Sequence, residues 1–86
     1  MDQELKRALD KILELPDTGY QDYAKTYAKA ALCHPYLGRE MVGEELRTQL
    51  LYVLNNLKYW KGYEAQTTKD ILRKHAGVKV KGGLTG

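Results

Sequence analysis

The chain has 86 residues, of which 43% are apolar and 29% are charged, and its formal net charge is +3. A chain of this length fills one hydrophobic core but not two, and the composition excludes an intrinsically disordered protein. Its apolar runs are much shorter than the roughly 20 residues that a membrane-spanning helix needs. The single cysteine, Cys33, has no partner for an internal disulfide, so we expect a cytoplasmic protein with no membrane segment.

The first predicted helix runs from about residue 2 to residue 14. Its apolar residues recur at steps of three and four, the spacing of one helix face: Leu5, Ala8, Leu9, Ile12 and Leu13. Asp2 is placed to act as the N-cap, because its carboxylate can accept hydrogen bonds from the free N–H groups of the first turn. Pro16 is expected to stop the helix, since proline disfavours helical angles at the residue before it.

The second predicted helix begins around Thr18 and Gln21, whose spacing is that of a capping box. Large rings alternate with methyl groups along one stripe of this helix: Tyr20, Tyr23, Ala24, Tyr27, Ala28 and Ala31. Small residues let another helix approach closely, so the stripe is expected to pack on a neighbouring helix rather than to bind a ligand.

Two further helices follow a break that contains Pro35 and Gly38. The third is predicted from Arg39 to Trp60 and is the longest, with a start on either side of Gly43, which weakens its first turns. The fourth is predicted from Glu64 to Ala76. Gly77 then acts as its C-terminal cap, and Val78 is placed to complete a Schellman motif.

These elements predict an all-α fold, a small bundle of three to four helices with a long central third helix. Residues 1–77 are expected to form a single helical domain. Residues 78–86 contain no helical pattern and are expected to form a flexible, basic C-terminal tail.

The third predicted helix has two faces that favour contact. When its residues are projected at 100° per residue, one arc is aliphatic: Val42, Leu46, Leu50, Val53, Leu54 and Leu57, with Trp60 at its edge. A second face, well away from this arc, carries the polar and aromatic candidates for an interface: Gln49, Tyr52, Asn56 and Tyr59. Either neighbouring helices cover this second face within the monomer, or it meets another molecule, and a homodimer is the simplest such complex.

Catalytic and metal chemistry are poorly represented in the sequence. Cys33 and His34 are adjacent, and their spacing requires no acid to orient the histidine, so a cysteine nucleophile is not expected. Together with His75 they supply at most three soft metal ligands, without the spacing of a zinc site. No glycine-rich phosphate loop precedes a helix. We therefore predict a protein that is not an enzyme and has no metal and no cofactor.

Positive charge gathers toward the C-terminal end. Residues 1–38 carry five Lys or Arg against six Asp or Glu, whereas residues 39–86 carry nine against five. The candidates for contact with nucleic-acid phosphates are basic residues near the end of the chain: Arg73, Lys74, Lys79 and Lys81. The same residues are also placed to complement the dipole of the fourth helix and to keep a small protein soluble.

The segment GEELRTQLLYVLNNLKYWKGYEAQTTKDILRKHAG, residues 43–77, resembles small helical proteins of unknown function that are carried by bacterial phages and prophages. The resemblance implies a cytoplasmic accessory protein that binds a host or viral macromolecule, and it assigns no site residue. From these observations we expect a non-enzymatic interaction module that self-associates through the third helix, with another protein as the other possible partner. The alternative is a nucleic-acid-binding accessory protein that uses the basic C-terminal end.

Overall fold

The computed structural model describes residues 1–17 and 19–78, and it confirms the all-α fold. Within these residues there are four helices and no strand. The helices are α1 (Gln3–Leu13), α2 (Tyr20–Leu32), α3 (Gly43–Asn55) and α4 (Tyr63–Ala76). Thr18 and residues 79–86, and with them the predicted cap at Thr18 and most of the predicted tail, lie outside the described residues. No helix in the described part of the chain combines the length and apolarity needed to cross a bilayer.

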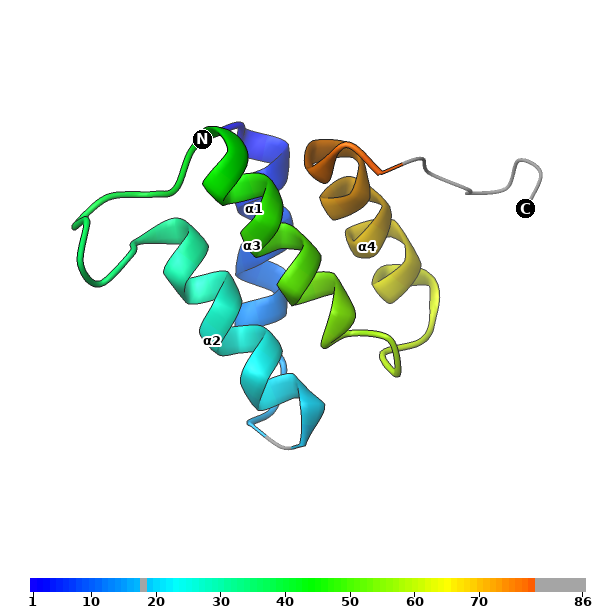
Figure 1. Ribbon diagram of the computed structural model, residues 1–86. Coiled ribbons are helices and arrows are strands. Elements are labelled where there is room, and N and C mark those ends of the chain that lie inside the picture. Colours follow the sequence, from blue (N-terminus) through cyan, green and yellow to red (C-terminus); the bar gives the residue numbers. More distant parts are fainter. Residues whose placement is uncertain (18, 79–86) are drawn as a thin grey trace.

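The four helices run alternately up and down, so that each is antiparallel to the next (Figure 1). Each helix packs against two others: α1 against α2 and α4, and α3 against the same pair. The third helix therefore lies between α2 and α4, as Figure 1 shows, and α1 lies diagonally across from it.

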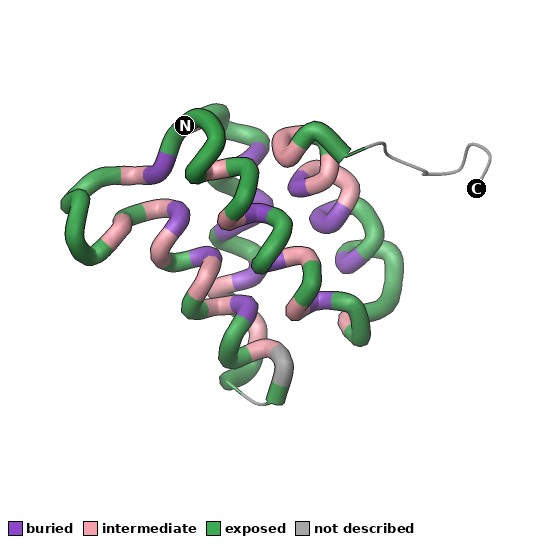
Figure 2. Tube along the Cα trace, in the orientation of Figure 1, coloured by how far each residue is buried: buried purple, intermediate pink, exposed green. Residues whose placement is uncertain are grey.

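The space enclosed by the helices is filled mainly by leucine and alanine. The buried cluster consists of Leu5, Ala8, Leu9, Ile12, Ala24, Ala28, Ala31, Leu50, Val53, Leu57 and Leu72. Figure 2 shows the buried positions on the inward sides of the helices and the exposed positions outside. The stripe predicted for the first helix supplies four members of the cluster, because residues three and four apart share a helix face.

Both predicted caps on the outer helices are present. The Asp2 carboxylate accepts hydrogen bonds from the backbone N–H of Glu4 at 2.8 Å and of Leu5 at 3.3 Å. At the end of α4, Gly77 adopts the left-handed conformation, with φ of 79°. The backbone N–H of Val78 then donates to the carbonyl of Arg73 at 2.9 Å, which completes the predicted Schellman hydrogen bonds.

The third helix is shorter than predicted, with 13 residues against the 14 of α4. Its start falls at Gly43, where φ is 60°, and the preceding Val42 is extended. A side chain at position 43 would be strained at this angle, so the chain enters the helix through a glycine. Arg39 lies instead in the loop, where its carbonyl accepts a hydrogen bond from the backbone N–H of His34 at 2.9 Å. Val42, placed in the aliphatic arc by the helical projection, is exposed.

The C-terminal limit of α3 is set by its asparagines. The helix ends at Asn55, and the side chain of Asn56 donates to the carbonyl of Tyr52 at 2.8 Å. Asparagine side chains compete with the backbone for such carbonyls, and they disfavour continued helix. The chain then forms a turn, in which the backbone N–H of Leu57 donates to the carbonyl of Leu54 at 3.0 Å.

A buried lysine of α4 closes this turn. The ammonium of Lys69 donates to the carbonyl of Leu57 at 3.1 Å and to that of Trp60 at 2.7 Å. Both carbonyls lie beyond the end of α3, where no helical N–H reaches them. Burial is the largest influence on this amine and lowers its pKa below the usual 10.5. Lys69 therefore ties the turn after α3 to the helix that follows it.

The second helix buries its alanines but not all of its tyrosines. Ala24, Ala28 and Ala31 are completely buried, as the stripe predicts. Tyr27 is half-buried, whereas Tyr23 is 64% exposed, contrary to the expectation that the whole stripe packs inward. Short alanine side chains bring the α2 backbone close to its neighbours, so a ring at the margin of the stripe is left outside the contact.

Candidate functional site

The candidate interface on α3 is built around two stacked tyrosines. The rings of Tyr27, from α2, and Tyr52, from α3, have centroids 5.6 Å apart and are tilted by 30°. Tyr52 remains 52% exposed although one side of its ring meets Tyr27. The structure thus combines the two interpretations of this face: it is partly covered within the monomer, and it keeps an exposed aromatic surface.

The two polar candidates on this face are used inside the monomer. The Gln49 side-chain amide donates to the backbone carbonyl of Tyr27 at 2.9 Å, which links α3 to α2. Asn56 donates to the carbonyl of Tyr52, as described above, at the end of its own helix. Both residues are only partly exposed. They hold the Tyr27 and Tyr52 backbones in place, and that is the role the structure gives them.

Tyr59 does not lie on the helix, because α3 ends four residues earlier. It stands in the turn before α4 and is 67% exposed, and the ammonium of Lys58 lies 5.8 Å from the centre of its ring. A helical projection places Tyr59 with Tyr52 on one face, but that relation depends on a helix that continues to Trp60. We call Tyr27 and Tyr52, whose rings are in contact, the tyrosine surface.

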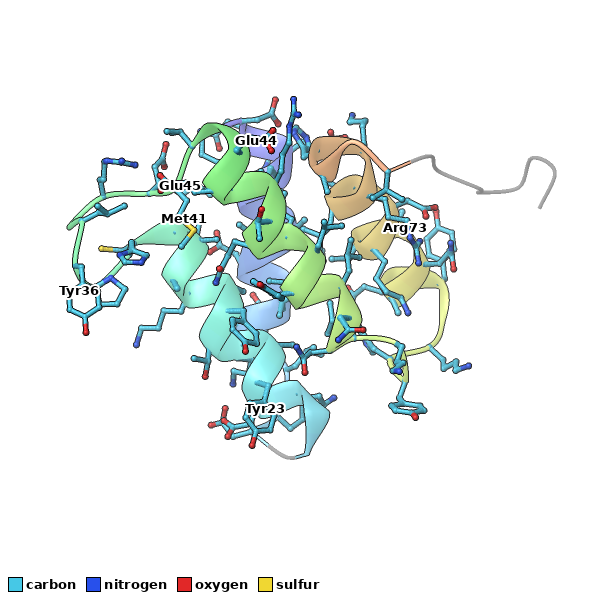
Figure 3. All side chains as sticks on the ribbon, in the orientation of Figure 1. Tyr23, Tyr36, Met41, Glu44, Glu45 and Arg73 are labelled. Atoms are coloured by element: carbon cyan, nitrogen blue, oxygen red, sulfur yellow. The ribbon has the colours of Figure 1, made fainter. Side chains whose placement is uncertain are left out.

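The candidate interface omits Tyr27, which packs on the neighbouring helix as its stripe predicts and whose ring also supports Tyr52. Tyr23, seen on α2 in Figure 3, was expected to be covered. The excess of tyrosine over other aromatic residues, with seven Tyr, one Trp and no Phe, is the signal that points to such positions, because tyrosine suits surfaces that are only half-buried.

The basic candidates for nucleic-acid contact are paired where they are described. The guanidinium of Arg73 lies 2.7 Å from the carboxylate of Asp70, on the same helix. The ammonium of Lys74 lies 2.6 Å from the carboxylate of Glu4, on α1. Lys79 and Lys81 lie outside the described residues. Arg73 and Lys74 therefore have partners within the protein that a phosphate would have to displace.

Cys33 and His34, the pair that a cysteine nucleophile would require, have different surroundings. Cys33 is exposed at the end of α2. The Nδ1 atom of His34 accepts hydrogen bonds from the backbone N–H groups of Tyr36 at 3.1 Å and Leu37 at 3.3 Å. That nitrogen organises the loop that leads toward α3.

The structure brings together one cluster that the sequence did not suggest. Nε2 of His75, at the end of α4, lies 3.7 Å from the Asp2 carboxylate and 3.5 Å from the Glu4 carboxylate, at the start of α1. This nitrogen is buried and has no hydrogen-bond partner among the described residues. Because Asp2 caps α1 and Glu4 holds Lys74, the cluster joins the first helix to the last. His75 is more than 70 positions from both Asp2 and Glu4 in the sequence, so no local spacing could have revealed the cluster.

The contacts in this cluster predict a loss of stability in acid. The pKa of Asp2 is lowered from 3.8, chiefly by the hydrogen bond from Leu5, and the pKa of Glu4 is lowered from 4.5, chiefly by the hydrogen bond from Lys74. The unfolded chain therefore takes up these protons at a higher pH than the folded chain. We expect the urea midpoint to fall as the pH drops below about 4.5 and then through the lowered pKa values of Asp2 and Glu4.

Glu4→Gln should reduce this fall, and Asp10→Asn, on the same helix, serves as the matched control. Asp10 is exposed and has no ion pair or hydrogen bond among the described residues. Urea unfolding at neutral pH and at pH near 3 measures the difference for each variant. An equal acid dependence in Glu4→Gln and in the unmodified protein would show that the Lys74 contact does not contribute.

Comparison of the chain with protein-family models, with curated proteins and with solved structures finds no match in any of the three.

Proposed function

We propose that this protein is a non-enzymatic binding module that self-associates through the tyrosine surface. The observation that carries the proposal is the half-exposed ring of Tyr52, held in place by the ring of Tyr27 from the neighbouring helix. A ring that is already oriented loses little conformational freedom when it is buried against a partner. Tyrosine is also among the residues enriched at the energetic centres of protein interfaces.

The polar groups near these rings favour burial as well. The side-chain N–H groups of Gln49 and Asn56 each already donate to a backbone carbonyl. Covering them costs less than covering unsatisfied amides, because an unpaired buried polar group is what makes burial expensive. A two-fold axis through the surface would place each Tyr52 near its copy, so one patch suffices for both partners.

The variant Tyr52→Glu is the test of this proposal. A carboxylate in a covered interface would have to lose water without a counter-charge, so we expect the dimer to weaken by at least about 30-fold, the scale of one interface hot spot. Sedimentation or light scattering across the micromolar range measures the change. Circular dichroism should show unchanged helicity, because Tyr52 is half-exposed in the monomer.

Tyr36→Glu is the matched control, since Tyr36 is 93% exposed and lies in the loop between α2 and α3 (Figure 3). It should self-associate as the unmodified protein does. If the unmodified protein is a monomer at every concentration, or if Tyr36→Glu weakens association as much as Tyr52→Glu, the proposal fails.

A further inference from the structure

A cavity of about 500 Å³ that is open to solvent lies between α1 and α4, the helix pair that does not contribute to the tyrosine surface, and most of its lining residues are exposed. Its volume is within the range of small-molecule sites, roughly 300 to 1,000 Å³. The two helices line it with stripes of the same spacing. The stripe from α1 is Glu4, Arg7, Ala8 and Lys11, and the stripe from α4 is Glu64, Thr67, Thr68 and Ile71, with Tyr63 beside it.

The cavity exists because small side chains stand where the two helices meet. Ala8 and Thr68 are both almost fully buried, and neither side chain is long enough to fill the space that separates α1 from α4. Ile71 adds an apolar wall and packs at the margin of the core. The hydroxyl of Thr67 already donates a hydrogen bond to the carbonyl of Tyr63 at 2.5 Å, so its proton is not available to a ligand. The interior offered to a ligand is therefore largely apolar.

The charges around the cavity are arranged unevenly. Toward one end, the ammonium of Lys11 lies 3.0 Å from the carboxylate of Glu64, and toward the other, Glu4 is paired with Lys74. Arg7 lies between Glu4 and Lys11 on α1, and it has no ion pair or hydrogen bond among the described residues. Each acidic group on the lining is neutralised by a lysine, which leaves one guanidinium without a counter-charge.

We propose that this cavity binds an apolar molecule that carries a single carboxylate. The guanidinium of Arg7 can hold a carboxylate with two parallel hydrogen bonds, and the apolar part can cover Ala8 and Ile71. A second negative charge would find no unpaired cation on the lining besides Arg7, because Lys11 and Lys74 are already paired with Glu64 and Glu4, so a group with a single charge is favoured. A neutral apolar molecule gains the contacts with the cavity interior but leaves Arg7 unpaired.

Titration with decanoate, followed by amide NMR shifts, tests the site, and decanol is the neutral comparison. We expect saturable shifts that concentrate in residues 4–11 and 63–71, and weaker binding of decanol. Arg7→Gln should weaken decanoate binding by about tenfold, because one charge-assisted contact is lost. Lys6→Gln is the matched control: Lys6 is the adjacent exposed cation, does not line the cavity and should leave binding unchanged.

A second variant, Thr67→Trp, tests the cavity independently of its charge. Thr67 is exposed on α4, so a large ring there should occupy the cavity without disturbing the core, and decanoate binding should be lost while helicity is kept. The proposal is overturned if decanoate gives no saturable shifts at millimolar concentration, if the shifts concentrate on the tyrosine surface, or if Arg7→Gln binds as tightly as Lys6→Gln.

Discussion

Leu57→Ala is expected to lower the free energy of unfolding by about 3 kcal/mol, the central cost of truncating a buried leucine to alanine. Leu57 lies two residues beyond the end of α3, yet its side chain is fully buried in the core. The loss combines the apolar contacts of the removed atoms with the cavity that they leave. Urea unfolding followed by circular dichroism measures it.

The same truncation at Leu51, which is 45% exposed on α3, is the control and should change stability by less than about 1 kcal/mol. The free energy of unfolding of a small domain is typically only about 5 to 15 kcal/mol, so the Leu57 variant should lose a large part of this free energy. Equal effects at the two positions would contradict the placement of Leu57 in the core.

Lys69→Met is expected to destabilise the protein by about 2 kcal/mol, although methionine matches the length and apolar character of the lysine stem. The substitution removes the donor shared by the carbonyls of Leu57 and Trp60. The Leu57 carbonyl keeps a hydrogen bond from the backbone N–H of Trp60 at 3.0 Å, so the loss falls mainly on the Trp60 carbonyl. Losing the donor of this part-buried acceptor outweighs the relief of no longer burying an ammonium. The effect should appear as a lower urea midpoint with unchanged cooperativity.

Lys29→Met, at an exposed position on α2, is the matched control and should alter stability by less than about 0.5 kcal/mol. Stability in Lys69→Met equal to or above that of the unmodified protein would mean that the cost of burying the charge exceeds the value of its two hydrogen bonds.

The parts of the fold that could be predicted are those fixed by neighbours in sequence. The Asp2 cap and the Gly77 cap each depend on residues within one helical turn, and both are present. The inward stripe of α1 follows from the same local geometry. Helix existence and the all-α class were predictable for this reason.

The parts that could not be predicted depend on residues far apart in sequence. The helical projection continued α3 to Trp60 because the aliphatic pattern continues, but Asn56 ends the helix and Lys69 stabilises the turn that follows. The same early end removes Tyr59 from the face that holds Tyr52. Of the candidate interface residues, Gln49 was identified by its position on the helix, yet its partner on α2 could not be inferred from spacing.

The pairing of the first helix with the last has a mechanical consequence. The start of α1 and the end of α4 lie at the same end of the bundle (Figure 1), where Glu4 and Lys74 are in contact. A tension applied between residues 3 and 76 would load that contact first and then separate the two helices progressively from one end. Such peeling breaks interactions a few at a time, so the bundle should yield at a lower force than one in which the pulled helices must slide past each other.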